Sequence, residues 1–357
     1  MRPCGWAVLS LLMIFAGAET LPSLGHKSWK NQSLRVIDEV LSGDLLERRR
    51  RLISRPRIGK LTTVALVHIS RTGGLSLNRL LVEQRGLSAD NGIQRFPDCV
   101  VPRLAYGNSS VPISQRFDFP NCEVLSAIWP LPTIRAKISF KREAIFITML
   151  RDPSSRVMSQ WRADTYRLPE VFDKCKSFEQ IFSGTKTGAQ LAGVRSCLQK
   201  GTQPVQYVDY QTLMIGGCKW DGNKRSCTAS SSFDPASLLA KFSFVGILEH
   251  FDIAICLLYY TIGDEGKFRK FCKHRTHRVP HQNRAPKPGG DPFRQVFSPV
   301  ALKYLWLTNR KDHEVYWAAY RNFIRDVSVM EAATNVNFLS RLYRKDAVGG
   351  GRMHLDY

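Results

Sequence analysis

The sequence predicts a three-layer α/β protein, with a central parallel sheet and helices on both faces. The first observation is a pair of short apolar segments, Leu61–Ile69 and Ala144–Leu150, which are typical of strands in a buried parallel sheet. The second is that each segment leads through a glycine or proline turn into a helical pattern. Strands that alternate with helices indicate a parallel sheet, in which ligands bind outside the carboxyl ends of the strands.

Residues 67–78 join the first strand to its helix and have the composition of an anion-binding loop. Gly73 and Gly74 allow the backbone to turn tightly and to approach an anion, toward which the first N–H groups of the helix point. The loop also carries one cation and two hydroxyl donors: Arg71, Thr72 and Ser76. It is not a Walker A loop, because no Gly-x-x-x-x-Gly-Lys-Ser/Thr spacing fits. An ordinary turn is the alternative interpretation.

A second candidate anion site directly follows the second strand. Arg151 ends the strand, Asp152 is a suitable helix cap, and Pro153 fits the first helical turn. Ser155 and Ser159 then lie four residues apart on one face of the helix. An arginine at a strand end and a hydroxyl on the next helix can bind a phosphate together. A capped helix with a solvated arginine face is the alternative.

Turn residues and hydrophobic spacing predict the remaining elements. We expect helices at 75–85 and 153–167, a long loop at 86–143, mixed helices to about 200, a loop near Cys218–Cys227, a helix from Asp234 to Phe242, a strand at 243–249, and helices at 250–261, 298–308 and 309–327. No internal repeat is visible. The even alternation of strands and helices favours one large domain over two small ones.

The two candidate anion sites together resemble those of the sulfotransferases that use 3′-phosphoadenosine 5′-phosphosulfate (PAPS), most closely the heparan sulfate 6-O-sulfotransferases. The loop of those enzymes, His-Ile-x-Lys-Thr-Gly-Gly-Thr, is similar to His-Ile-Ser-Arg-Thr-Gly-Gly-Leu at 68–75. Their second motif, Leu-Arg-Asp-Pro-x-Ser-Arg-x-x-Ser-x-Trp, is nearly complete at 150–161. Residues 244–251 and 309–319 are similar to two later family segments. The resemblance spans about residues 60–327 and implies a P-loop-like sheet.

The resemblance implies a role for each part of the two sites. The 5′-phosphosulfate end of the donor would be held by Ser70, Arg71, Thr72, Gly73, Gly74, Leu75 and Ser76. Arg151 and Ser159 would hold the 3′-phosphate. Sulfuryl transfer, like phosphoryl transfer, depends on positioning and on neutralising the leaving oxygen, so no metal is required. Arg71 replaces the Lys of the 6-O-sulfotransferases and keeps its charge. Plant-type tyrosylprotein sulfotransferases, which resemble the same family, tolerate Arg here.

The acceptor side departs from the family pattern. The 6-O-sulfotransferases use a histidine as general base, and this chain has Ser126 at the matching place. Glu123 is the nearest ionisable candidate, and a solvated loop carboxylate is the alternative. Either the base has moved, or the alignment has slipped, or the chain binds the donor without activity. Three functions therefore stay open: a carbohydrate O-sulfotransferase, a tyrosylprotein sulfotransferase, and a non-catalytic nucleotide- or glycan-binding protein.

The composition favours an anionic partner. The chain has 52 Lys and Arg against 30 Asp and Glu, a formal net charge of +22, which is large enough to attract polyanions. An anionic polysaccharide or a protein acceptor is expected, and nucleic acid is not, because no recognised nucleic-acid motif accompanies the charge. Basic residues concentrate between Lys267 and Arg284, where a solvated loop is the alternative. No Cys and His spacing indicates a zinc site.

The N-terminus predicts entry into the secretory pathway. Arg2 precedes the apolar run Trp6–Ala18, which is shorter than the roughly twenty residues of a membrane span and ends in a small-residue cleavage pattern. We expect the mature protein in the Golgi lumen or secreted, with membrane anchorage through the N-terminus as the alternative. The predicted parts are a signal peptide or short signal anchor at 1–18, a flexible basic stem at 19–59, a sulfotransferase domain at 60–343 and a disordered tail at 344–357.

Cysteines and glycosylation sequons agree with a lumenal protein. The chain has 9 cysteines, of which eight follow the N-terminal apolar run: Cys99, Cys122, Cys175, Cys197, Cys218, Cys227, Cys256 and Cys272. An even number in this context indicates disulfides, and Cys218 and Cys227, which flank a short polar loop, are the first expected pair. Cys256 lies in an apolar helix, where a buried thiol is the alternative to a disulfide. Asn31 and Asn108 begin N-glycosylation sequons.

Overall fold

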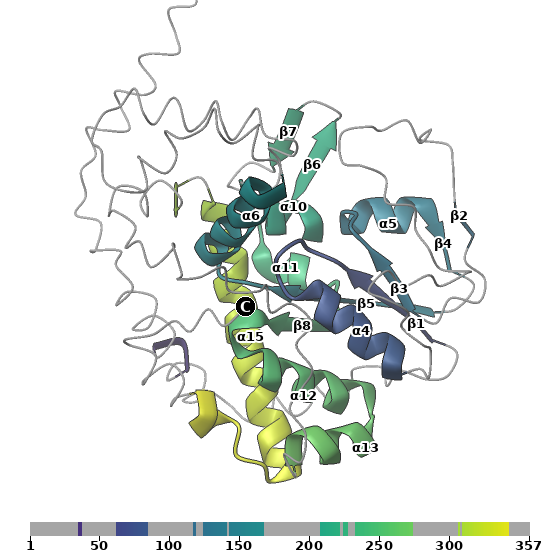
Figure 1. The fold of residues 1–357 in the computed structure, drawn as a ribbon, viewed down its shortest axis with the longest axis vertical. Coiled ribbons are helices and arrows are strands. Elements are labelled where there is room, and N and C mark those ends of the chain that lie inside the picture. The colour runs from purple at the N-terminus through teal and green to yellow at the C-terminus, as the bar shows by residue number, and fades with distance from the viewer. Residues whose placement is uncertain are drawn as a thin grey trace, which may run out of the picture.

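The fold is centred on a four-stranded parallel sheet in the order β3-β1-β5-β8 (Figure 1). The structure is a computed structural model that describes residues 35–37, 62–84, 117–118, 124–140, 143–167, 208–221, 224–227, 233–273, 306–307 and 309–342. The strands of the sheet are β1 (Thr62–Val67), β3 (Val124–Ala127), β5 (Glu143–Leu150) and β8 (Phe244–Ile247). All three strand pairings are parallel. The prediction of an α/β protein with a parallel sheet packed against helices is therefore confirmed.

The two strands that carry the motifs lie where the sequence predicts them. β1 and β5 are neighbours, with the Cα of Leu66 opposite that of Ile147. Residues 145–150 are all buried, because β5 has a strand on each side and helices packed against the sheet. This double enclosure explains why the strand is a continuous apolar run instead of an alternating one.

The long loop predicted over 86–143 is wrong for the part of that segment that the structure describes. It contains β3, the helix α5 (Leu131–Lys137), and a short parallel pair of β2 (Phe117–Asp118) and β4 (Ile138–Ser139). β3 has only four residues, too few for a periodic signal of its own. Its register is set by β1, with Val64 opposite Val124 and Val67 opposite Ala127.

The helices that follow the motif strands begin as expected. α4 spans Gly74–Gln84 and α6 spans Pro153–Arg167. The carboxylate of Asp152 caps α6, because its Oδ1 accepts a 2.8 Å hydrogen bond from the backbone N–H of Ser155. Pro153 occupies the first helical position, where its missing N–H has no cost.

The C-terminal half supplies two long helices that pack against β8. α12 spans Phe251–Ile262, and α15 spans Arg310–Thr334, longer than the predicted 309–327. Asn335 ends α15 in the left-handed conformation at φ 55°. The shorter α11 (Pro235–Leu239) begins at Asp234, whose side chain accepts from the N–H groups of the first turn. Figure 1 shows α15 in yellow-green alongside α12.

The structure shows that Cys256 is in a disulfide, and it places a second, predicted pair of cysteines opposite each other. Cys256 is not a free thiol, because it forms a disulfide with Cys272 that links α12 to the π-helical segment Phe268–Lys273. The loop predicted near Cys218–Cys227 contains the antiparallel strands β6 (Cys218–Asp221) and β7 (Lys224–Cys227). Cys218 is disulfide-bonded and lies directly opposite Cys227 across this ladder. The pairing of these two cysteines stays a prediction.

Several predicted parts lie outside the described residues. They are the signal segment 1–18, the tail 344–357, Glu123, both sequons and the basic segment beyond Lys273. Within the predicted stem 19–59, residues 35–37 are helical, and Val36 and Ile37 are buried in the core. In the described part of the chain, no helix combines the length and the hydropathy that a membrane span requires.

Candidate functional site

The candidate site lies at the ends of two neighbouring strands, β1 and β5, from which the chain continues toward opposite edges of the sheet. From the end of β1 the chain continues to β3 on one side, and from the end of β5 it continues to β8, the next strand of this sheet, on the other side. In open α/β sheets, ligands bind outside the carboxyl ends of two neighbouring strands whose connections diverge in this way. The two predicted motifs follow the two strands concerned, so the topology brings them to one place.

A direct hydrogen bond joins the two motifs. Arg151 Nη1 donates to the backbone carbonyl oxygen of Arg71 over 3.2 Å. Arg71 is one of the non-glycine residues with positive φ, at 69°, a conformation that costs about 1–2 kcal/mol for an L-residue. Arg151 is only 3% exposed, so its guanidinium lies against the loop instead of projecting into solvent. The two predicted cations therefore belong to one local structure.

The paired glycines are required by packing within the protein. Gly73 has φ 79°, and an added Cβ would lie 2.6 Å from Leu248 Cδ1. A Cβ on Gly74 would lie 2.2 Å from the ring of His68. The sequence predicts glycines here for the approach of an anion, but protein atoms already fill the space that each Cβ would take. Glycine at these positions thus lets the loop pack onto the end of the sheet.

Some side chains of the loop are buried and support the turn from within, while others are partly exposed to solvent. Thr72 is 1% exposed, and its hydroxyl donates to the carbonyl of Ile69 over 2.9 Å, which closes the turn from within. Ser76 is buried, while Ser70 is half-buried and Leu75 is 40% exposed. The first backbone hydrogen bond of α4 runs from Leu77 to Gly73. The N–H groups of residues 74–76 therefore belong to the first turn of the helix, the end at which anions are stabilised.

Side chains from neighbouring elements hold the backbone just after β5. The side-chain amide of Gln211 bonds to Arg151 twice: its Oε1 accepts from the N–H over 2.9 Å, and its Nε2 donates to the carbonyl over 2.8 Å. Glu249, at the end of β8, accepts from the N–H of Asp152 over 2.9 Å. The sequence prediction did not include Gln211, and it gave Glu249 no role.

On α6, one arginine is part of the core. Arg156 is fully buried, and its guanidinium lies over the ring of Tyr210 at 5.2 Å from the centroid. Because Arg151 and Arg156 are both buried, the alternative of a solvated arginine face is wrong for these two residues. Ser155 is buried and Ser159 is half-buried, one turn farther along the helix.

Three polar residues of the C-terminal segment support these contacts from one helix face, spaced by three and four residues: Asn309, Asp312 and Tyr316. Asn309 Oδ1 accepts from the N–H of Asp209 over 2.9 Å. Asp312 accepts from the N–H groups of Gln211 over 3.1 Å and of Thr212 over 2.7 Å.

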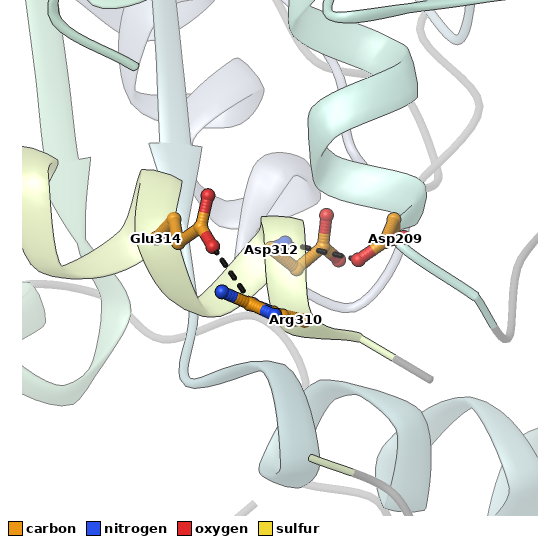
Figure 2. Close-up of polar contacts among 4 residues, drawn as sticks. All are labelled: Asp209, Arg310, Asp312 and Glu314. Atoms are coloured by element: carbon orange, nitrogen blue, oxygen red, sulfur yellow. Dashed lines mark hydrogen bonds and ion pairs between the residues drawn. The ribbon is translucent and has the colours of Figure 1, made fainter. Parts of the chain in front are cut away.

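Tyr316 supports the other side of the site. Its hydroxyl donates to Glu249 Oε2 over 3.1 Å. Figure 2 shows the start of the same helix, where the N–H of Asp312 bonds to the Asp209 carboxylate while Arg310 pairs with Glu314 on the exposed side. The spacing Asn-x-x-Asp-x-x-Val-Tyr was visible in the sequence, but its partners lie about 70 to 100 residues away along the chain.

The carboxyl group of Glu249 has an unusual environment. Burial, followed by the nearby Asp152 carboxylate, raises the pKa of Glu249 to about 7, although Arg151 acts in the opposite direction. Burial, followed by the nearby Glu249 carboxyl group, raises the pKa of Tyr316 well above its ordinary value. Burial lowers the pKa of His313, against the opposing effects of Asp152 and Asp312. The charge beside Arg151 therefore changes near neutral pH.

The segment assigned to the acceptor side ends at the same sheet edge. Ser126 lies within β3 opposite Leu66, and it is half-buried. The N–H of His68 donates to the carbonyl of Ala127 over 2.8 Å, so the end of β3 adjoins the loop after β1. Glu123 lies just before β3, outside the described residues, and its position relative to the site is not described.

No protein-family model, curated protein or solved structure matched the chain. In the described segments, no group of three or more His, Cys, Asp or Glu side chains is arranged to hold a metal ion. What the site offers chemically is two arginines, one helix N-terminus and a carboxyl group with a pKa near neutrality. The arginines and the helix N-terminus suit the binding of an anion, whereas the carboxyl group opposes it when ionised.

Proposed function

We propose that the chain is an O-sulfotransferase that moves a sulfuryl group from PAPS to a hydroxyl of a heparan-sulfate-like or other polysaccharide in the secretory pathway. The observation that supports this most is the contact of Arg151 Nη1 with the carbonyl of Arg71. PAPS carries anionic groups at both the 3′ and 5′ positions of one ribose, so it needs two cationic sites close together. Motifs that resemble the two family sites adjoin on neighbouring strands.

The proposal includes the P-loop-like, three-layer form of the sheet with helices on both faces. Residues 70–76 would hold the 5′-phosphosulfate with backbone N–H groups and the charge of Arg71, and Arg151 and Ser159 would hold the 3′-phosphate. The N-terminus of α6 is already capped by the Asp152 carboxylate. The N-terminus of α4, which follows the loop of residues 70–73, is therefore the better helix end for an anion.

The chemistry expected of these residues is electrostatic. Cations and N–H donors aimed at the leaving phosphate oxygen stabilise the charge that develops there when the bond to sulfur breaks. A general base must remove the proton of the acceptor hydroxyl, and Glu123 is the candidate. The net charge of +22 supports an anionic polysaccharide as acceptor. Arg71 favours a protein tyrosine as the second candidate.

The test is a comparison of two nucleotides by calorimetry, 3′-phosphoadenosine 5′-phosphate (PAP) and AMP, which differ in the 3′-phosphate alone. Losing a charge-assisted contact with Arg151 costs about 1.5–3 kcal/mol, so PAP should bind about 10- to 150-fold more tightly. Equal affinities would mean that Arg151 only braces the loop, and the sulfotransferase proposal would fail. Radiolabelled PAPS with a panel of glycans and tyrosine peptides then separates the acceptors, and tight donor binding without transfer would indicate a non-catalytic protein.

A further inference from the structure

Gln211 continues the support of β5 at the point where the sheet ends. The ladder between β5 and β8 has its last Cα pair at Leu150 and Ile247. At the next residue, Arg151, the side-chain amide of Gln211 bonds to both the backbone N–H and the carbonyl. The side chain of Gln211 thus makes the backbone hydrogen bonds to Arg151 that a neighbouring strand would otherwise make.

The chemistry of this position favours an amide. Gln211 is fully buried, and a buried amide is costly unless its donor and acceptor are both satisfied. A leucine would fill similar space, and a glutamate could accept a hydrogen bond but could not donate one while ionised. An amide of this length can satisfy both backbone groups of Arg151, so its role is to fix the orientation of that backbone.

Gln211 is itself held in place by a rigid element. It lies in the short helix α10 (Tyr210–Ile215), every residue of which is buried. Its own N–H donates to Asp312 Oδ2 over 3.1 Å, and Asp312 also accepts from the N–H and the hydroxyl of Thr212. The position of the amide is therefore tied to α15 and does not depend on the loop after β1.

We propose that Gln211 is a positioning residue that sets the affinity of Arg151 for the 3′-phosphate of the donor. The inference rests on the proposed function, because it assigns Arg151 to that phosphate. The side chain of Arg151 donates to the loop carbonyl of Arg71, and its backbone is held by Gln211. If the backbone is released, the guanidinium loses its alignment, and its charge-assisted contact with the phosphate, which contributes about tenfold or more in affinity, weakens.

The experiment measures PAP and AMP binding by calorimetry in the full chain. Gln211→Leu should weaken PAP binding by about tenfold or more and change AMP binding by less than about twofold. Gln211→Asn, one methylene shorter, should weaken PAP binding in the same way but by less. It replaces the leucine variant in the test if that variant does not fold. Leu213→Ala is the matched control, because Leu213 is as deeply buried in the same helix and its apolar side chain makes no hydrogen bond to Asp312. It should lower the melting temperature while the ratio of PAP to AMP affinity stays that of the wild type.

A second set of variants separates positioning from general destabilisation. In an Arg151→Ala background, Gln211→Leu should change the PAP to AMP ratio no further, because the group that it positions is gone. The inference is overturned if Gln211→Leu weakens both nucleotides equally, or if it lowers the ratio as much without Arg151. A wild-type protein that binds PAP and AMP equally would overturn the proposed function first, and this inference with it.

Discussion

Glu249 is expected to make the free energy of unfolding depend on pH between about 4.5 and 7. Its pKa is raised from 4.5 to about 7 in the folded protein, first by burial and then by the Asp152 carboxylate. The difference is about 2.5 pH units, and at about 1.36 kcal/mol per unit it corresponds to about 3 kcal/mol.

The direction follows from proton binding. Between the two pKa values the folded protein holds a proton on Glu249 that the unfolded chain has lost, so stability falls as pH rises. The contribution is fully present below about pH 4.5, and it is lost as pH passes through about 7. A glutamine at this position is neutral throughout, can still accept from the N–H of Asp152, and can donate to the hydroxyl of Tyr316.

Urea unfolding of the wild type and of Glu249→Gln at several values from pH 4.5 to pH 8 tests this expectation. The stability of the variant relative to the wild type should rise by about 3 kcal/mol over this range. Because other titrating groups, such as His313, are present in both proteins, their contributions cancel in the difference between the two free energies of unfolding. Thr334→Val is the control, because it removes the hydrogen bond of the Thr334 hydroxyl to the carbonyl of Met330 without removing an ionisable group, so it should change stability by the same amount at every pH. Parallel profiles for Glu249→Gln and the wild type would refute the reasoning.

Three further outcomes are expected. Arg71→Ala should lower transfer by about 10²–10³-fold while Arg71→Lys keeps a substantial fraction; near-normal steady-state turnover of the alanine variant would make the loop a structural turn. Gly73→Ala should lower stability in urea unfolding by about 1–3 kcal/mol more than Gly263→Ala, because both glycines have positive φ but only the first would overlap a side chain, that of Leu248; equal losses would contradict this. Glu123→Gln should lower turnover by about 10²-fold and leave nucleotide affinity unchanged, and a silent change would exclude this residue as the base.

The sequence was sufficient for those elements whose signals are local. β5 and α6 were predicted almost to the residue, because a continuous apolar run is followed by a helix cap and a proline at the first helical position. The α11 start at Asp234 was predicted from the same kind of signal. The two motif segments could be found in this way because each follows directly from a strand.

Features that depend on distant contacts could not be predicted. β3 is too short to be recognised alone, and its strand character comes from pairing with β1 about 60 residues earlier. Gln211 has no local signature, because its role depends on Arg151, 60 residues away. Nothing in the apolar sequence around Cys256 shows that Cys272 lies close enough for a disulfide. The sequence could suggest two anion sites, but it could not show that they adjoin.

The C-terminal helix supports the end of β5, one of the two strand ends that form the candidate site. Asp312 holds α10, which carries the amide that fixes Arg151. One turn farther along, Tyr316 holds Glu249, which accepts from the N–H of the residue after Arg151. The chain at the end of β5 is thus supported from two sides by one face of α15. Because support of this kind positions binding groups more accurately than a loop alone, a change on that face should weaken donor binding and stability together, even though α15 itself carries neither motif.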